Sequence, residues 1–262
     1  MRLGISVLGI VGACWYSSCA LAGDSGISSI NCATTSYRSV ISFFGGYANV
    51  NAGGRASYLG SEGTVYSYRS LKDGQSDGFL GGFIGIEHPI SWYNLLVQAG
   101  LEYNYFGPVG VQGLNTVSMA SGVSTLHRYN YNFLAHQFLV SAKLLTTTYA
   151  RYHPYASAGI GAAVTNMEHF RATAVQAGGG NTTPFFAEHN ATRFSYNVGL
   201  GVDADVNQYT RLGLGYRFSS LGDAALKRGQ MLVNNQLVPV PFALGAHNTY
   251  ANQLVAQITF VV

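Results

Sequence analysis

The chain has 262 residues, of which 48% are hydrophobic and 13% aromatic but only 10% charged. Soluble domains carry about 25% charged residues, so this composition argues against an ordinary cytosolic globular protein. The high apolar content also excludes intrinsic disorder. The formal net charge of +3 comes from basic residues that are scattered singly along the sequence. We therefore expect no nucleic-acid partner.

The first 22 residues have the pattern of a secretory signal peptide. A basic start at Met1-Arg2 precedes an apolar stretch from Leu3 to Trp15, and Ala20-Leu21-Ala22 fits a cleavage site for signal peptidase. The competing site is Val11-Gly12-Ala13-Cys14, which resembles a lipoprotein processing box. Cleavage after Ala22 leaves Cys32 as the single cysteine, so no internal disulfide is expected.

Strict alternation of apolar and polar residues predicts β-strands with two unlike faces. The clearest run extends from Phe194 to Val206. Similar runs occupy 95–105, 137–144, 155–164, 211–218 and 253–262, and two weaker segments near 37–50 and 77–90 bring the count to eight. After residue 22 no segment is long and apolar enough to form a transmembrane helix.

Short and long connections alternate between the predicted strands. The short ones are 89–92, 147–153 and 207–210, and the long ones are 51–76, 107–127, 166–191 and 220–248. We therefore predict an all-β fold: a transmembrane antiparallel up-and-down β-barrel of eight strands, with short periplasmic turns and four long extracellular loops. The competing architecture is a secreted lipocalin-like barrel, whose polar face would be rich in Lys and Glu rather than in the Gly, Ser, Asn and Gln of this chain.

The sequence resembles the small eight-stranded outer-membrane barrels, namely the OmpA transmembrane domain, the OmpX/Ail proteins and the opacity-type surface antigens. The resemblance rests on the signal peptide, Val198-Gly199-Leu200-Gly201-Val202-Asp203, Leu212-Gly213-Leu214-Gly215-Tyr216-Arg217-Phe218 and the amphipathic last strand. The last strand departs from the family, because Val261-Val262 follow Phe260 and the usual Gly is missing. We divide the chain into a signal peptide (1–22), a short periplasmic segment (23–36) and a barrel (37–262).

Charged residues on the polar strand faces predict a salt-bridge network inside the barrel, because buried charges need partners. This predicted network comprises Glu102, Lys143, Arg193, Asp203, Asp205, Arg211 and Arg217. An eight-stranded barrel is only wide enough for its own side chains, so a general porin is not expected.

Aromatic residues gather near both ends of the predicted strands and predict two girdles at the membrane interfaces. The girdle residues are Trp92, Tyr93, Tyr103, Tyr105, Tyr152, Tyr155, Tyr196 and Tyr209.

No motif for a cofactor or metal occurs in a suitable context. The stretch Gly199–Ala204 matches a dinucleotide-binding pattern but falls inside a predicted strand, and the seven histidines lack zinc-ligand spacing. We therefore expect no cofactor and no metal. The alternative to a non-enzymatic barrel is a lipid A-modifying enzyme, an acyltransferase or deacylase, with His247 and Ser219 or Ser220 at the outer rim.

The long loops are the predicted functional regions. Met231-Leu232-Val233 and Leu237-Val238 flank Asn234-Asn235-Gln236 and predict a hairpin. The second loop, 107–126, is apolar, either because it contacts a partner or because the loops pack on one another as a cap. We expect a monomer in the outer membrane of a Gram-negative bacterium, with a structural and surface-interaction role of the adhesion or immune-evasion type. Its expected partners are outer-membrane lipid and lipopolysaccharide, the barrel assembly machinery and a host surface protein.

Overall fold

The computed structural model describes residues 37–60, 63–71, 75–90, 94–122, 124–149, 151–175, 183–233, 236–240 and 242–262. By its contacts the chain divides into two units, Met1–Thr34 and Thr35–Val262. The predicted signal peptide, the 23–36 segment and Cys32 lie outside the described residues. Within the described residues, no helix has the length and apolar character needed to cross a bilayer.

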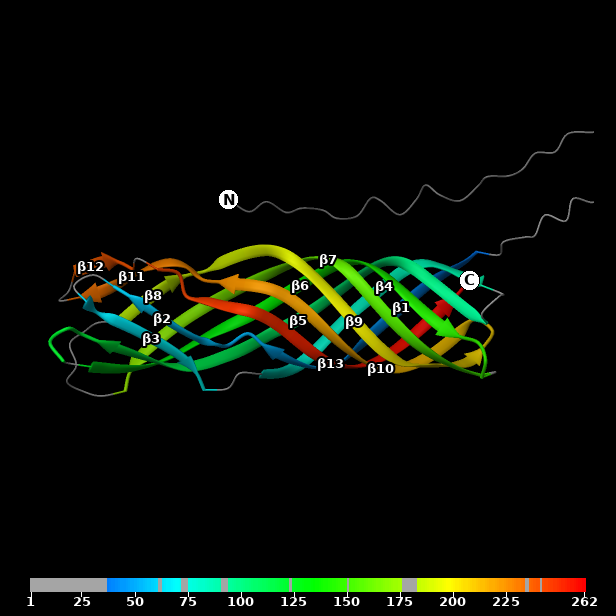
Figure 1. The fold of residues 1–262 in the computed structure, drawn as a ribbon, viewed down its shortest axis with the longest axis horizontal. Coiled ribbons are helices and arrows are strands. Elements are labelled where there is room, and N and C mark those ends of the chain that lie inside the picture. The colour runs from blue at the N-terminus through cyan, green and yellow to red at the C-terminus, as the bar shows by residue number, and fades with distance from the viewer. Residues whose placement is uncertain are drawn as a thin grey trace, which may run out of the picture. The chain divides into compact units, whose positions relative to one another are not determined.

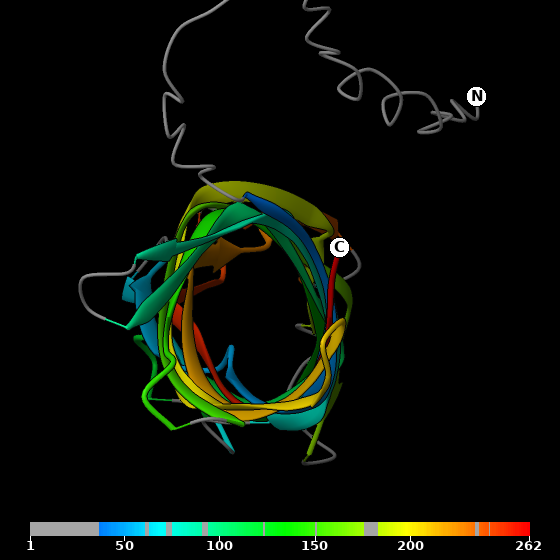
Figure 2. The ribbon, with the colours of Figure 1, turned by 90° about the vertical axis from the view of Figure 1, so that its right-hand side faces the viewer.

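Eight long strands close into a ring, which Figure 2 shows end-on. They are β1 (Arg38–Asn51), β4 (Gln75–Ile90), β5 (Leu95–Ser118), β6 (Ser124–Thr146), β7 (Tyr152–Ala174), β9 (His189–Asn207), β10 (Thr210–Ala225) and β13 (Gly245–Val261). Each strand pairs antiparallel with both neighbours in the order β5-β4-β1-β13-β10-β9-β7-β6, and β6 pairs with β5 to close the ring. This confirms the predicted eight-stranded antiparallel barrel.

Five short strands lie at the end of the barrel opposite the C-terminus (Figure 1). β2 (Arg55–Leu59) and β3 (Val65–Ser70) form a hairpin, and β3 pairs with β5 from Gly113 to Ser118. A separate sheet contains β8 (Thr183–Ala187), β11 (Lys227–Val233) and β12 (Gln236–Pro239). The predicted hairpin is confirmed, since Leu232 pairs with Leu237 across β11 and β12.

The strands extend well beyond the segments that alternation predicts. β5 and β6 run on to Ser118 and back from Ser124, so the predicted second loop is largely two paired strands. We call the part of the barrel beyond the predicted strands the extension. It comprises the described residues of 51–71, 106–135, 165–193 and 221–251.

The wall next to the extension carries apolar side chains on its outer face and polar ones inside; we call this part the band. Leu200 on β9 is 66% exposed and Leu214 on β10 is 70% exposed, although both are aliphatic. Their inward neighbours include the fully buried Asp203 and the largely buried Arg217. Apolar side chains outside and polar side chains inside are the arrangement of a transmembrane barrel.

The polarity of the two faces inverts where the band meets the extension. On β6 the inward residues change from Lys143, Ser141 and Gln137 in the band to apolar residues in the extension, among them Phe133 and Tyr131. The outward residues change in the opposite sense, from Phe138 and Val140 to Asn132 and Asn130. The extension is therefore built as a water-exposed barrel around an apolar core.

On β5 the inversion is produced by a β-bulge. Phe106 pairs with Ala135 of β6, but the next pair is Val109 with Phe133, so β5 holds one extra residue there. A bulge of this kind moves the following residues to the opposite face. Odd-numbered apolar residues thus point outward in the band, as Leu101 does, and inward beyond the bulge, as Val111 does.

Candidate functional site

The interior of the band contains three groups of paired charges. The first surrounds Glu87 of β4, whose side chain is fully buried. Arg38 Nη2 lies 2.5 Å from Glu87 Oε1, Arg211 forms a second ion pair with the same carboxylate, and Gln98 Nε2 donates a hydrogen bond at 2.8 Å. Arg211 also bonds Asp205, with 2.9 Å between Nε and Oδ1.

The second group is the pair between Lys143 and Asp203. The ammonium of Lys143 lies 2.6 Å from Asp203 Oδ2, and Gln257 Nε2 donates to Oδ1 at 2.6 Å. The same ammonium lies 3.8 Å from the centroid of the Tyr155 ring. A buried carboxylate with both oxygens occupied meets the condition under which such a pair is tolerated in a protein interior.

The third group joins Glu102 and Arg217, whose Oε1 and Nη1 are 2.5 Å apart. The same carboxylate oxygen accepts hydrogen bonds at 2.8 Å from Asn104 and from Asn197. Arg217 also lies over the ring of Phe44, 4.6 Å from its centroid. The Arg217 side chain thus lies between the polar lumen and the first aromatic residues of the apolar core.

The charges of this network balance. Its four cations are Arg38, Lys143, Arg211 and Arg217, and its four carboxylates are Glu87, Glu102, Asp203 and Asp205. A cavity of about 50 Å³ lies among Ser141, Lys143 and Arg217. That volume holds a few water molecules, since one water needs roughly 10–15 Å³ on this measure.

Of the predicted network residues, Glu102, Lys143, Asp203, Asp205, Arg211 and Arg217 lie together in the lumen, whereas Arg193 does not belong to the network. Arg193 is exposed, and its guanidinium donates to the Thr192 carbonyl oxygen at 3.4 Å. The pairing between β9 and β10 ends at Tyr196 and Ser220, so Arg193 lies in the extension, beyond the last pair of these two strands.

Sequence reasoning missed Arg38, Glu87 and His153. His153 Nε2 lies 2.8 Å from Asp205 Oδ2, and its Nδ1 lies 2.9 Å from the carbonyl oxygen of Thr146. Glu87 belongs to a strand whose alternation is obscured by four glycines, and Arg38 stands at the very start of β1. In both weak strands every second residue points inward. A search for charged residues at those positions would have found Arg38 and Glu87.

The predicted girdle residues are placed differently from one another. Tyr152 and Tyr209 are each 61% exposed beside the short connections, and Tyr103 and Tyr196 are exposed at the edge next to the extension. Tyr155 instead points into the lumen, against Lys143. The inward parity of β7 accounts for this, because Tyr155 lies two residues from the buried His153.

The remaining predicted girdle residues are Tyr105, Trp92 and Tyr93. The Tyr105 ring is half-buried and lies 5.2 Å from the ring of His136, centroid to centroid. Trp92 and Tyr93 lie outside the described residues.

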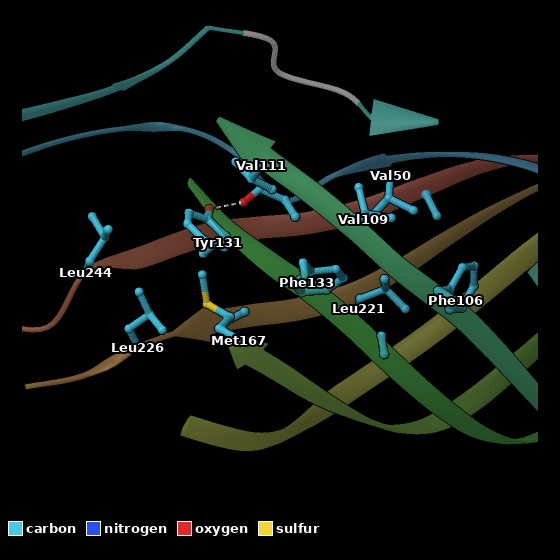
Figure 3. Close-up of a cluster of buried hydrophobic side chains, with 14 of the residues drawn as sticks. Val50, Phe106, Val109, Val111, Tyr131, Phe133, Met167, Leu221, Leu226 and Leu244 are labelled. Atoms are coloured by element: carbon cyan, nitrogen blue, oxygen red, sulfur yellow. Dashed lines mark hydrogen bonds between the residues drawn. The ribbon is translucent and has the colours of Figure 1, made fainter. Parts of the chain in front are cut away.

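Aromatic side chains fill the far end of the extension. Tyr58 stacks on Phe242 with 4.2 Å between ring centroids, and Phe242 also contacts Tyr66, Tyr68 and Phe186. Figure 3 shows the buried apolar cluster, to which Phe106, Phe133 and Leu221 contribute from different strands. The Tyr131 hydroxyl donates to the Ala52 carbonyl oxygen at 2.8 Å. Tyr68 also contacts Tyr129, with 5.6 Å between ring centroids. We call Tyr58, Tyr66, Tyr68, Tyr129, Phe186 and Phe242 the aromatic cap.

The aromatic cap is expected to open at alkaline pH. Burial raises the pKa of Tyr129 to about 12, above the value of about 10 for an exposed tyrosine. Folding therefore favours the neutral phenol, so its stabilisation is complete below pH 10 and is lost as the pH rises toward 12. Tyrosinate absorbance should appear cooperatively in this interval, together with loss of near-ultraviolet circular dichroism. Titration of Tyr129 near pH 10 without loss of the dichroism would contradict this prediction.

Three valines of the predicted second loop are not part of an exposed surface. Val109, Val111 and Val117 are buried in the apolar core of the extension. Two interpretations of this segment were offered, contact with a partner and packing as a cap. The burial of these valines agrees with packing, and it leaves their side chains inaccessible to a partner. The pleat of β5 explains the difference, because it turns alternate residues of a paired strand inward.

The residues considered for an enzymatic rim site have other partners. The Ser219 hydroxyl is buried and accepts a hydrogen bond from Gln253 Nε2 at 2.7 Å. The carbonyl oxygen of Ser220 accepts from the Ser195 hydroxyl at 2.5 Å. His247 is exposed, with Nδ1 3.8 Å from Asp223 Oδ2. The Ser219 hydroxyl and the His247 imidazole thus each lie against another residue.

The glycine-rich stretch 199–204 lies wholly within β9. Gly199 and Gly201 face inward, where an added Cβ would meet Ser157 Oγ at 2.8 Å and the backbone oxygen of Leu214 at 2.5 Å. These glycines therefore make room in the barrel wall, and no helix N-terminus follows them to hold a phosphate.

Of three comparisons with known proteins, one finds similar chains, among solved structures. No family model matches the chain, and no curated protein is significantly similar to it. Solved structures with a similar fold are small outer-membrane β-barrels. Neisserial surface protein A is 14% identical, with 85% of this chain and 96% of that chain covered and a TM-score of 0.39. OprG of Pseudomonas aeruginosa is 15% identical, with 85% and 95% covered and a TM-score of 0.41. Ail of Yersinia pestis is 8% identical, with 86% and 98% covered and a TM-score of 0.35.

Proposed function

We propose that this protein is a monomeric outer-membrane barrel of a Gram-negative bacterium that holds a folded extension above the cell surface. The observation that carries the proposal is the inversion of polarity along β5 and β6. Residues such as Leu200 and Val140 place aliphatic side chains outward in the band, whereas Asn130 and Asn132 face outward in the extension. A membrane around the band and water around the extension satisfy both surfaces.

The role that this arrangement supports is structural and one of surface interaction. The lumen is filled by balanced ion pairs and closed above by apolar and aromatic side chains, which favours display over diffusion of solutes. The partners are outer-membrane lipid and lipopolysaccharide around the band, the barrel assembly machinery during insertion, and a host surface protein at the extension.

Two measurements test this location. The native protein should be recovered with the outer membrane, and its gel mobility should change on boiling, because a closed barrel resists detergent until heated. Recovery in the soluble periplasm together with unchanged mobility would overturn the proposal.

The orientation is tested by thiol labelling of intact cells. In a Cys32→Ser background, Ser57→Cys lies in the extension and Thr148→Cys lies at a short connection, and both positions are exposed. A membrane-impermeant maleimide should label Ser57→Cys on intact cells and Thr148→Cys only after lysis. The reverse pattern would place the extension in the periplasm.

A further inference from the structure

Three buried polar side chains of the extension carry atoms without a hydrogen-bond partner among the described residues. They belong to Tyr68 of β3, Asn115 of β5 and Thr125 of β6, which are 1%, 0% and 7% exposed. The orphaned atoms, within the part of the chain that the structure describes, are the two hydroxyls and both amide atoms of Asn115. Buried polar groups are nearly always hydrogen-bonded, so such a group of exceptions needs an explanation. We call Tyr68, Asn115 and Thr125 the polar strip.

The pairing register places the polar strip on one patch of the inner face. Tyr68 pairs with Asn115, and Asn115 pairs with His127 of β6, two residues from Thr125. Side chains that are directly opposite each other lie about 5 Å apart, and diagonal ones about 7–8 Å apart. The amide of Asn115 carries a donor and an acceptor side by side. One small molecule could therefore contact all three residues of the polar strip.

Rings of the aromatic cap pack around Tyr68. Its ring lies 6.0 Å from the ring of Phe186 and 6.3 Å from that of Phe242, centroid to centroid. Phe242 is stacked on Tyr58 with only 3° between the two ring planes. No Asp, Glu, Lys or Arg occurs among the buried described residues of the extension. An ion would therefore lack a counter-charge here, and the parallel stack fits a flat ring better than a puckered one.

Phe242 lies where the cap can open with the least disruption. β2 is the last strand of the ten-stranded sheet and β12 is the last strand of the three-stranded sheet. Phe242 follows β12 and Tyr58 belongs to β2, so their stacked rings bridge the two sheets. Ring stacking is easier to separate than a ladder of backbone hydrogen bonds. A flat molecule that displaced the Phe242 ring would keep the stack on Tyr58 and lie beside Tyr68.

We propose that the aromatic cap binds a neutral flat heterocycle of the nucleobase class, which takes the place of the Phe242 ring. The ring of the ligand stacks on Tyr58, and an edge with a donor beside an acceptor bonds the amide of Asn115. Asparagine recognises bases through such paired hydrogen bonds, and aromatic side chains hold unstacked bases. This site goes beyond the display role proposed above. Binding is measured on purified protein, so it does not depend on how the barrel is oriented in the membrane.

The test is isothermal titration calorimetry of the whole barrel in zwitterionic detergent with adenine and with uracil. Indole is the reference for a flat ring that has a donor but no acceptor beside it, and glucose is the reference for a polar ring that is not flat. Asn115→Leu removes the amide from the polar strip. The matched control, Asn130→Leu, makes the same change at an exposed position on the outer face of β6. The gel shift on boiling shows that each variant is folded.

Wild type should bind adenine or uracil about tenfold or more tightly than indole or glucose, because these leave part of the Asn115 amide unpaired. Asn115→Leu should weaken binding of the base by about tenfold or more, and Asn130→Leu should stay within about twofold of wild type. Phe242→Ala should bind the base about tenfold more tightly than wild type, since no buried ring has to be displaced first.

Tyr68→Phe gives a second measurement if Asn115→Leu does not fold. It removes one hydroxyl and keeps the ring, so it should weaken binding of the base and leave binding of indole unchanged. Three results would each refute the proposal: no binding of either base by wild type and by Phe242→Ala, equal affinities of Asn115→Leu and Asn130→Leu, or tighter binding of glucose than of the bases. Absence of binding would leave water as the partner of the polar strip.

Discussion

Leu200→Arg is expected to destabilise the folded barrel in lipid by about 2–4 kcal/mol, the cost of a cation near the middle of the bilayer on the outer face. Leu200 is 66% exposed on the outer face of β9, with Val198 and Val202 on either side on the same face. The measurement is urea-induced unfolding in phospholipid vesicles, monitored by tryptophan fluorescence and by the gel shift on boiling.

Two control variants make this result specific to the membrane. Leu200→Ala removes side-chain volume without adding charge and should cost clearly less than Leu200→Arg. Asn190→Arg lies on the same strand ten residues away, in the extension, where water should solvate the cation at almost no cost. If Leu200→Arg is tolerated as well as Leu200→Ala, the band does not face lipid.

Asp203→Asn is expected to destabilise the barrel by about 3–5 kcal/mol, because it leaves the Lys143 ammonium buried without a counter-charge. Asp203 is fully buried, and the Lys143 side chain is 13% exposed. The matched control is Asp205→Asn, two residues along the same strand, since the Asp205 side chain is 35% exposed and Arg211 keeps its ion pair with Glu87. The same unfolding assay measures both variants.

The double variant Lys143→Met/Asp203→Leu separates the value of the pair from the cost of breaking it. Replacing both members of a buried ion pair by apolar residues is often close to neutral, so this variant should recover most of the lost stability. Equal effects of Asp203→Asn and Asp205→Asn would show that water reaches Lys143 and that the pair is not buried.

Strand pattern was the part of this structure that the sequence predicted best. The runs around Leu200 and Leu214 alternate cleanly because the band has lipid on one side and a polar lumen on the other. The extension was predicted as long connections, because the alternating runs end before it. Gly107, Pro108 and Gly110, which are residues typical of turns, belong instead to a bulged strand. Composition alone cannot tell a bulge from a turn.

The candidate site was also predicted only in part. Parity along a strand assigns Asp203 and Arg217 to the lumen, because the period of two is a local property. It assigned Arg193 there too, since parity carries no information about where the pairing of two strands ends.

The bulge on β5 determines which side chains of the following residues face inward. On either side of Gly107 and Pro108, successive side chains alternate between the two faces of the strand. The single extra residue changes whether the odd-numbered or the even-numbered residues face inward. An insertion or deletion of one residue here would exchange the inner and outer faces of the last ten residues of β5, and a change of two residues would preserve them. Variation in the length of this strand is therefore restricted to even steps, while the surface residues of the extension are free to diverge one at a time.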